Sequence, residues 1–154
     1  MNAAGAPIVD ATIKKDIKGT LMAYLQAHMA PSDPDTRMRE LRHGSAEVEY
    51  EITRTVPEAM QALLGTPAVV GHEKASIASG QIISTTTTPV GNLCVLHVRL
   101  EYTQGDEPSV PGTRVRAYVD VKWNKKAPSG IVNQLITDTC RLWVTKELNY
   151  MDSL

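Results

Sequence analysis

In the segment TRVRAYVDVKWNKKAPSGIVNQLITDTCRLWVTKELNYM, residues 113–151, the hydrophobic period changes in the middle. Apolar residues alternate with polar ones up to Trp123, which is typical of a β-strand with two unlike faces. After Pro128 they recur every third or fourth residue, which is typical of an amphipathic helix. The segment therefore predicts a strand, a turn and a long helix that Ser129 caps, that runs to about residue 150 and that lies across a sheet.

A second strand with the same alternation precedes this segment. LCVLHVRLEYT places Leu96, Val98 and Leu100 on one face and His97 on the other, and the loop QGDEPSVPG separates it from the next strand. The two strands predict an antiparallel pair. Their polar faces carry both signs of charge, and we expect cross-strand ion pairs among Arg99, Glu101, Arg116 and Asp120.

The middle of the chain predicts further strands and a short helix. EVEYEIT, residues 47–53, alternates strictly and places its glutamates on a solvated face. In TVPEAMQALLG, Pro57 suits the first turn of a helix and Gly65 suits its end. Two weaker strands are predicted at residues 68–72 and 76–88.

The first 45 residues predict an amphipathic helix and a linker. Asp10 or Thr12 caps this helix, and the segment TRMRELRHG, which ends at Gly44, is interpreted as a helical turn or linker. The chain accordingly divides into residues 1–45, the N-terminal helix and linker, and residues 46–154, the sheet and its helices. The apolar stripe of the N-terminal helix consists of Ile13, Ile17, Leu21, Leu25 and Met29.

Size and composition set the class of protein. With 154 residues the chain can bury one hydrophobic core, and the absence of phenylalanine makes that core aliphatic. A net charge of -1 gives no general attraction for nucleic acid or for an anionic membrane. No apolar run has the length of a transmembrane segment, and the first residues lack the pattern of a signal peptide. We therefore expect an intracellular protein, soluble or peripheral, in a compartment that the sequence leaves open.

The residues with reactive side chains form no known catalytic motif. Cys94 and Cys140 lie in apolar contexts, so both are expected to be small buried residues without a disulfide. The four histidines are scattered, and without a nucleotide loop or a metal-binding pattern we expect no metal, no cofactor and no enzymatic activity. His97 and Tyr118 on neighbouring strands imitate an acid–base pair, but alternation places both on the face away from the helix.

Several of these segments resemble one superfamily. VEYEITRTVPEAMQALLG resembles the opening strand and first helix of START-like (helix-grip, SRPBCC) domains. GNLCVLHVRLEY, TRVRAYVDVKWNKK and IVNQLITDTCRLWVTKEL are similar to the C-terminal half of VASt domains, the START-related sterol-transfer modules. The resemblance covers residues 47–148 and implies an α+β helix-grip fold. In such a fold, a curved antiparallel sheet of about five strands holds a long C-terminal helix across it, here with an extra N-terminal helix.

The resemblance also implies a function, which is to bind or carry a hydrophobic ligand such as a sterol or other lipid. The ligand would lie between the sheet and the last helix, where burial of apolar area drives binding. Plain core packing explains the same apolar positions. The candidate lining residues are Leu96, Val98, Leu100, Val119, Val121, Trp123, Leu135, Ile136 and Trp143.

Two alternatives stay open. The first is a START-like interaction subunit with a filled core, which docks through its N-terminal helix into a larger protein assembly. A short middle segment favours this alternative, as do Met22 and Tyr24, which lie beyond the main apolar stripe, and Met29 at the end of that stripe. The second is a START-like enzyme that acts on a polyketide or a similar ring.

Overall fold

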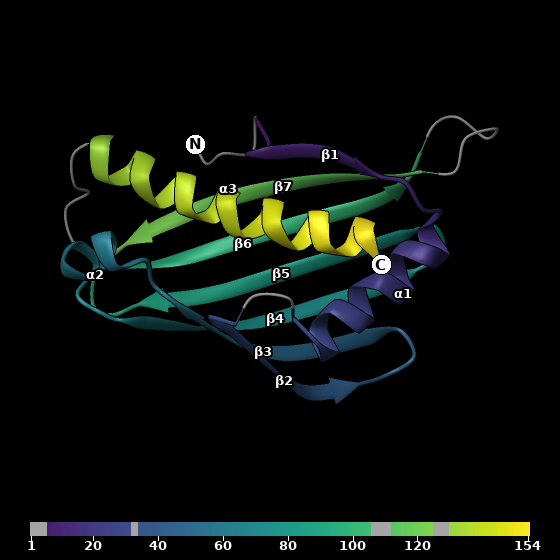
Figure 1. The fold of residues 1–154 in the computed structure, drawn as a ribbon, viewed down its shortest axis with the longest axis horizontal. Helices are drawn as coiled ribbons and strands as arrows, with labels where there is room; N and C mark the ends of the chain where they lie inside the picture. Colours follow the sequence, from purple (N-terminus) through teal and green to yellow (C-terminus); the bar gives the residue numbers. More distant parts are fainter. Residues whose placement is uncertain (1–5, 32–33, 106–111, 125–129) are drawn as a thin grey trace.

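The described part of the chain forms one antiparallel sheet with three helices on the same face (Figure 1). The computed structural model describes residues 6–31, 34–105, 112–124 and 130–154. The elements are β1 (Val9–Ile13), α1 (Ile17–Met29), β2 (Thr36–His43), β3 (Glu47–Thr55), α2 (Glu58–Leu64), β4 (Ala68–Ala78), β5 (Gln81–Val90), β6 (Cys94–Gln104), β7 (Thr113–Trp123) and α3 (Gly130–Ser153). The strand order is β1-β7-β6-β5-β4-β3-β2, so the sheet has seven strands where about five were predicted.

The helix-grip architecture is confirmed. The sheet is curved, α3 crosses it, and α1 and α2 lie at opposite ends of the covered face (Figure 1). Strand β6 pairs with β7 along its whole length, from Cys94↔Trp123 to Gln104↔Thr113, as the two alternating patterns predicted. Helix α2 follows Pro57 and ends at Gly65, whose φ of 72° is the left-handed conformation that glycine favours at this position.

The predicted start of the N-terminal helix is wrong. Val9–Ile13 is an edge strand that pairs with β7 in the register Val9↔Ala117 to Ile13↔Thr113. Helix α1 begins only at Ile17, and Asp16 caps it by accepting a hydrogen bond from the Gly19 amide at 2.7 Å. Asp10 and Thr12, the predicted caps, therefore belong to the strand.

The predicted linker is also a strand. TRMRELRH forms β2, which pairs antiparallel with β3, so it contains no helical turn. Two of its arginines face the acidic row of β3: Arg39 pairs with Glu51 at 3.2 Å and Arg42 with Glu47 at 3.4 Å. The first 45 residues thus supply both edge strands of the sheet as well as α1.

Helix α1 is rotated relative to the predicted stripe. Ile17, Leu21 and Leu25 are only partly buried, and Met29 is 78% exposed. The reason is that polar side chains on the neighbouring face find buried partners, such as the Thr113 hydroxyl, which lies 2.7 Å from the Thr20 hydroxyl. The buried residues of α1 are Thr20, Ala23, Tyr24, Ala27 and His28.

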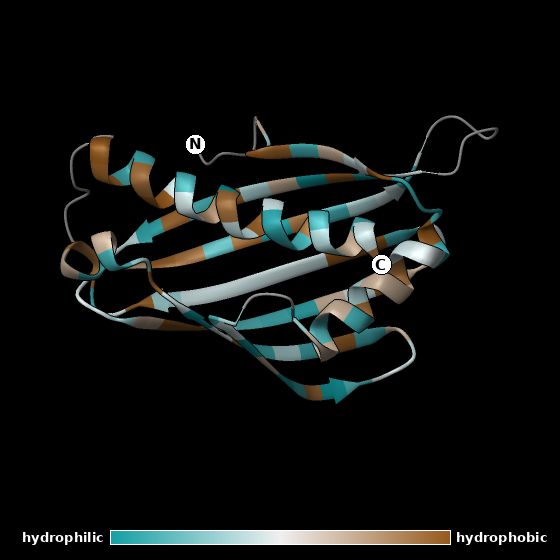
Figure 2. Ribbon diagram, viewed as in Figure 1, coloured by the Kyte–Doolittle hydropathy of each residue, from teal (hydrophilic) through white to brown (hydrophobic). Residues whose placement is uncertain are grey.

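Helix α3 faces the sheet with about one buried residue per turn. Bands of apolar residues alternate with polar ones along α3 (Figure 2). The apolar face is narrower than the recurrence of apolar residues after Pro128 predicts, because Ile131, Leu135 and Leu142 are exposed. The helix runs to Ser153, beyond the predicted end, and the predicted cap Ser129 lies outside the described residues. The buried residues are Ile136, Cys140, Val144, Leu148 and Met151.

The core divides into two clusters along α3. One gathers side chains of α1 and the neighbouring strands around Tyr24 and Tyr102, and the other gathers side chains of α2 and α3 around Met60 and Cys140. Val98 of β6 packs against both clusters. Cys94 and Cys140 are both buried and free, which confirms that prediction. None of the described helices has the length and apolar character needed to cross a membrane.

Candidate functional site

A small cavity lies between the two core clusters, beneath the middle of α3. Its volume is about 40 Å³, and four strands and the helix line it. Val98 marks its position: the inward side chains before and after it on β6, Leu96 and Leu100, are buried, whereas Val98 is only partly buried. The lining residues are Ile52, Arg54, Val69, Gly71, Glu73, Thr86, Thr88, Leu96, Val98, Leu100, Cys140, Trp143, Val144 and Glu147.

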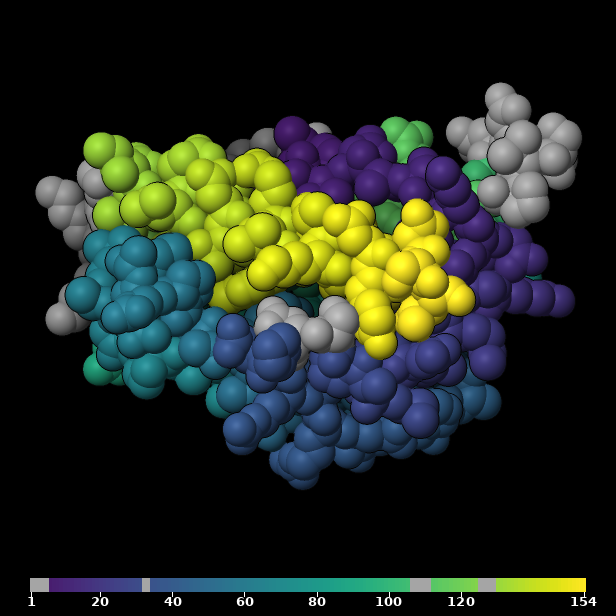
Figure 3. Space-filling view, viewed as in Figure 1, coloured from purple at the N-terminus to yellow at the C-terminus, as the bar shows by residue number. Residues whose placement is uncertain are grey.

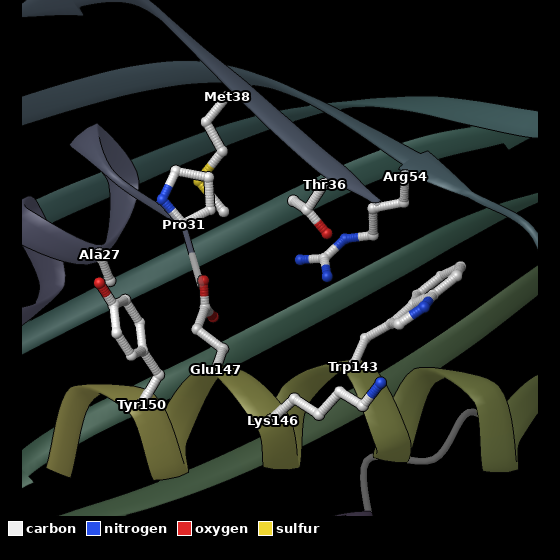
Figure 4. A pocket seen from close by; sticks show the side chains of 9 residues that line it. All are labelled: Ala27, Pro31, Thr36, Met38, Arg54, Trp143, Lys146, Glu147 and Tyr150. Atoms are coloured by element: carbon white, nitrogen blue, oxygen red, sulfur yellow. The ribbon is translucent and has the colours of Figure 1, made fainter. Parts of the chain in front are cut away.

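A second hollow of about 30 Å³ adjoins this cavity. Arg54, Trp143 and Glu147 line both spaces, so the two adjoin at these side chains. The second hollow, called the mouth below, lies between α3 on one side and α1 and β2 on the other (Figure 4), and the surface is visibly hollowed beside α3 (Figure 3). The mouth is lined by Ala27, Pro31, Thr36, Met38, Arg54, Trp143, Lys146, Glu147 and Tyr150.

Arg54 and Trp143 form the boundary between the mouth and the cavity. The guanidinium carbon of Arg54 lies 5.3 Å from the centre of the Trp143 ring, which is a cation–π distance. Figure 4 shows the two side chains approaching one another from β3 and from α3. Because both side chains have rotatable bonds, a change in their rotamers would widen the entrance without unfolding either element.

Close packing of β4 against β5 shapes the floor of the cavity. A Cβ atom on Gly71 would lie 2.4 Å from the Thr88 hydroxyl oxygen and 3.1 Å from a methyl carbon of Thr86. Glycine is therefore required there if the two threonines are to point inward. Of the four consecutive threonines, Thr86 and Thr88 thus place polar groups on the covered face of the sheet.

Glu73 of β4 is a buried carboxylate with a partner at each oxygen. Its Oε2 accepts a hydrogen bond from the Tyr24 hydroxyl and lies 2.6 Å from Nε2 of His28. Its Oε1 accepts from the Thr86 hydroxyl at 3.1 Å. The carboxylate thus joins α1 to two central strands.

His28 is the cation that balances Glu73. Its Nδ1 lies 2.8 Å from the Tyr24 carbonyl oxygen, which can only accept, so Nδ1 carries a hydrogen. Burial lowers the pKa of His28, but the charge and the hydrogen bond of Glu73 outweigh burial and raise it to about 9. Burial likewise opposes ionisation of Glu73, yet the His28 cation lowers the pKa of Glu73 to about 2. The two therefore form a buried ion pair at neutral pH.

Two further polar groups in this region lack a partner. The Tyr102 hydroxyl and Oε1 of Glu147 are buried, and neither has a hydrogen-bond partner within the part of the chain that the structure describes. Glu147 Oε1 lies 3.8 Å from His28 Nε2, which is too far for a hydrogen bond. Burial raises the pKa of Glu147 and raises that of Tyr102 well above its ordinary value, and in Tyr102 the charge of Glu147 adds to the effect.

The structure brings some of the predicted lining residues together and separates others. Leu96, Val98, Leu100 and Trp143 line the cavity. Ile136 lines a smaller apolar hollow of about 10 Å³ that Leu96 and Trp143 also line. The correction concerns Leu135, which is 41% exposed because it lies on the solvent side of α3. Val119, Val121 and Trp123 pack in the cluster around Met60 and Cys140.

The polar residues of the site are the ones that sequence reasoning missed. Glu73 shares its alternation with Val69, Gly71 and Ala75, and this parity was the available signal that its side chain points inward. His28 lies four residues after Tyr24, so both lie on the same face of α1, but the face that packs on the sheet was misassigned.

The opposite face of the sheet carries a larger and more open hollow. Its volume is about 470 Å³, and its lining includes His97, Tyr118 and Asp120 together with threonines of β5. His97 and Tyr118 thus lie away from α3, as alternation predicted. Arg99 pairs with Glu101 of its own strand at 2.8 Å, instead of across strands as predicted.

Comparison with known proteins identifies the fold. No family model matches the sequence, and no curated protein sequence matches it significantly. The aromatase/cyclase ZhuI from Streptomyces sp. R1128 is similar in structure, with a TM-score of 0.67 and 9% identity over 94% of this chain and 89% of that one. A START superfamily protein from Mycobacterium smegmatis has a TM-score of 0.56 and 12% identity over 94% and 95%. Human STARD10 has a TM-score of 0.57 and 11% identity over 92% of this chain and 61% of that one. At these identities the likeness shows the fold alone: the chain has a START-like helix-grip fold.

Proposed function

We propose that this chain is a binding module that holds a small molecule with an apolar body between the sheet and α3. The observation that carries the proposal is the interior cavity that adjoins a surface mouth at Arg54, Trp143 and Glu147. Aliphatic side chains line one part of the cavity and polar groups line another, which is the usual composition of a small-molecule site. Proteins of the same fold include one described as START and one described as an aromatase/cyclase.

The size of the cavity limits how the ligand enters. A space of about 40 Å³ has room for only a few water molecules, well below the several hundred cubic ångströms that a drug-sized ligand occupies. Binding therefore requires the space to widen, through rotation of Arg54 and Trp143 or a shift of α3 away from the sheet. The finer hypothesis of VASt-like sterol transfer needs the largest opening and stays a prediction.

The ion pair supports a role without catalysis. A histidine with a pKa of about 9 is protonated at neutral pH, so His28 is not available as a general base. The carboxylate of Glu73 is held by three hydrogen-bond donors and has a pKa of about 2, so it is a weak base as well. These groups fix α1 to the sheet.

The proposal can be tested by filling the cavity. Val98→Trp should occupy the space between the clusters, whereas Leu135→Trp, on the solvent side of α3, is the matched control. Native mass spectrometry of gently purified protein, followed by organic extraction and thermal-shift assays with alkanes, fatty alcohols and sterols, measures binding. We expect the wild type and Leu135→Trp to bind, and Val98→Trp to lose at least about tenfold in affinity because the ligand and the indole compete for one volume.

The opposite result would favour the interaction subunit. On α1, Met22 is 67% exposed and Met29 is 78% exposed, and exposed methionines suit a docking surface. Tyr24, the third residue predicted for that surface, is instead buried in the core. A protein that carries no small molecule and shows no thermal shift with any compound of the panel would contradict the binding module and leave the exposed side of α1 as the better candidate.

A further inference from the structure

The buried polar groups in and beside the cavity divide into those with hydrogen-bond partners and those without. Both oxygens of Glu73, both ring nitrogens of His28 and the Tyr24 hydroxyl are engaged in hydrogen bonds with one another, with Thr86 or with the backbone. The Tyr102 hydroxyl and Glu147 Oε1 have no partner among the described residues. A buried polar group without a hydrogen bond destabilises the fold, so these two groups are the ones that a ligand would satisfy.

Of the two unpartnered groups, Glu147 lines the cavity, whereas Tyr102 lies outside its lining, with its ring 6.1 Å from the Tyr24 ring of α1. Glu147 lines both the cavity and the mouth, and its Oε1 is 3.8 Å from His28. Tyr102 lies one inward position beyond Leu100, which lines the cavity, and the charge of Glu147 acts on its hydroxyl. A ligand whose apolar body lies against Val98 and Leu100 would therefore direct its other end toward Tyr102 and Glu147.

We propose that the ligand carries an uncharged oxygen-bearing head group, an alcohol or a ketone, which pairs with Glu147 in the cavity and with Tyr102 just beyond its lining. This inference rests on the proposed binding function. A hydroxyl donates one hydrogen bond and accepts others, so it can pair with both groups. A ketone accepts from Tyr102 and from the protonated form of Glu147, and a plain hydrocarbon satisfies neither group.

Charge argues against an ionised head group at this position. Moving an ion from water into a buried site requires an opposite charge there. The His28 cation is already paired with Glu73. The Arg54 guanidinium lies over the Trp143 ring at the boundary with the mouth, so a carboxylate would bind there and not beside Tyr102. An ammonium group that paired with Glu147 would be repelled by the His28 cation, because His28 Nε2 lies only 3.8 Å from Glu147 Oε1.

The competing arrangement places a carboxylate at the mouth. Arg54 and Lys146 line the mouth, and a fatty acid could pair with them while its tail points inward. Ion pairs near solvent contribute little to binding, and this orientation leaves Tyr102 and Glu147 without partners. The two arrangements predict opposite orders of affinity, so one experiment separates them.

The experiment compares probes with one chain and different heads. Binding of 1-octanol, 2-octanone, octanoate, octylamine and octane to the full chain is measured by titration calorimetry. Tryptophan fluorescence, to which Trp143 at the mouth contributes together with Trp123, is a second signal. We expect octanol or octanone to bind about tenfold more tightly than each of the other three probes. Tyr102→Phe should lower the affinity for the favoured probe about fivefold and leave the affinity for octane unchanged. Tyr118→Phe, on the opposite face of the sheet, is the matched control and should change neither of these two affinities.

Tyr102→Phe has a further readout that confirms folding. The substitution removes a buried hydroxyl without a partner, so the melting temperature of the ligand-free variant should equal or exceed that of the wild type. Octanoate binding more tightly than octanol, equal binding of all probes, or an unchanged affinity in Tyr102→Phe would each overturn the inference and leave the binding function standing. Failure of every probe to bind would overturn both.

Discussion

Glu73 joins three segments that are far apart in the sequence. Its carboxylate holds the Tyr24 hydroxyl and the His28 ring of α1 and the Thr86 hydroxyl of β5. A buried ion pair gains Coulomb energy but loses the hydration of both ions, so the intact pair adds little net stability. Removing one partner is strongly destabilising, because it leaves the other charge buried without compensation. Removing the carboxylate leaves a buried histidine beside a second acid, Glu147.

The ion pair predicts how stability depends on pH. The pKa of His28 is raised from 6.5 to about 9, so the stability that it contributes is complete below about pH 6.5 and is lost as the pH rises through about 9. The pKa of Glu73 is lowered from 4.5 to about 2, so its contribution is complete above about pH 4.5 and is lost as the pH falls through about 2. The pKa of Glu147 is raised above 4.5, so the stability that this carboxyl contributes is also lost as the pH rises above 4.5.

Urea denaturation at about pH 6 and about pH 9.5 tests this prediction. We expect the free energy of unfolding of the wild type to fall by roughly 3 kcal/mol between the two. Glu73→Gln should lower the free energy of unfolding by about 3 kcal/mol at the lower pH. Between the two pH values, the free energy of unfolding of this variant should fall by less than half as much as that of the wild type. Glu101→Gln, which removes an ion pair on the opposite face, should lose under about 1 kcal/mol and keep the wild-type profile. A Glu73→Gln profile parallel to that of the wild type would show that the pair does not control stability.

The cluster shows what a sequence can and cannot reveal at the residue scale. The inward direction of Glu73 follows from the period-two pattern of β4. Its partners could not be predicted in the same way, because His28 lies 45 residues earlier and reaches it only if α1 turns its polar face inward. Which face of α1 turns toward the sheet depends on the buried hydrogen bonds that each orientation allows. These bonds depend on the tertiary structure and are not visible in the sequence of the helix.

At the scale of elements, the start of α1 shows how two periods can be confused. Ile13 lies four residues before Ile17, which fits a helix, but it is also the last inward residue of β1. The prediction followed the helical period and placed the cap too early. In β2, a register shift between Glu40 and Arg42 breaks the alternation, so an edge strand was interpreted as a linker.

Capping of α1 gives a prediction that distinguishes the helix start seen in the structure, at Asp16, from the start predicted from the sequence, at Asp10 or Thr12. Asp16→Ala should lower the free energy of unfolding by about 1 kcal/mol, because the Gly19 amide loses its acceptor. Thr12→Ala, at the cap predicted from sequence, is the control and should change it by less than about 0.5 kcal/mol, because Thr12 is exposed in β1. Chemical denaturation of the two variants measures both values. A larger loss in Thr12→Ala than in Asp16→Ala would contradict the observed start of the helix.

At the scale of the whole molecule, long periodic segments were predictable and short ones were not. Strands β6 and β7 and helix α3 each repeat one period over 11, 11 and 24 residues, and each was predicted with its type and approximate bounds. Strand β1 has 5 residues, too few to establish a period, and its assignment depends on pairing with β7. Leu96, Val98 and Leu100 on the aliphatic side of the cavity followed from one of these long segments, whereas Glu73, Thr86 and Thr88 on its polar side come from β4 and β5.

The N-terminal 45 residues provide the last prediction, which concerns whether residues 46–154 can fold alone. Without the preceding segment, β7 and β3 lose their neighbours β1 and β2, and the core loses the buried side chains of Ile13 and Tyr24. Burial of each large side chain contributes about 1.5–3 kcal/mol, and Glu73 would become a buried acid without its cation. Together these losses approach the 5–15 kcal/mol that typically stabilises a domain.

We therefore expect a fragment that begins at Ala46 to lack a cooperative urea transition and fixed near-ultraviolet circular dichroism, whereas the full chain should show both. Adding residues 1–45 as a separate peptide should restore part of the signal, because its two strands pair with exposed edges of the fragment and its helix returns His28 to Glu73. Glu73→Gln in the fragment should weaken that restoration, since the peptide then loses its buried partner. A fragment that unfolds cooperatively near the midpoint of the full chain would instead show that the division at residue 45 separates two independent parts.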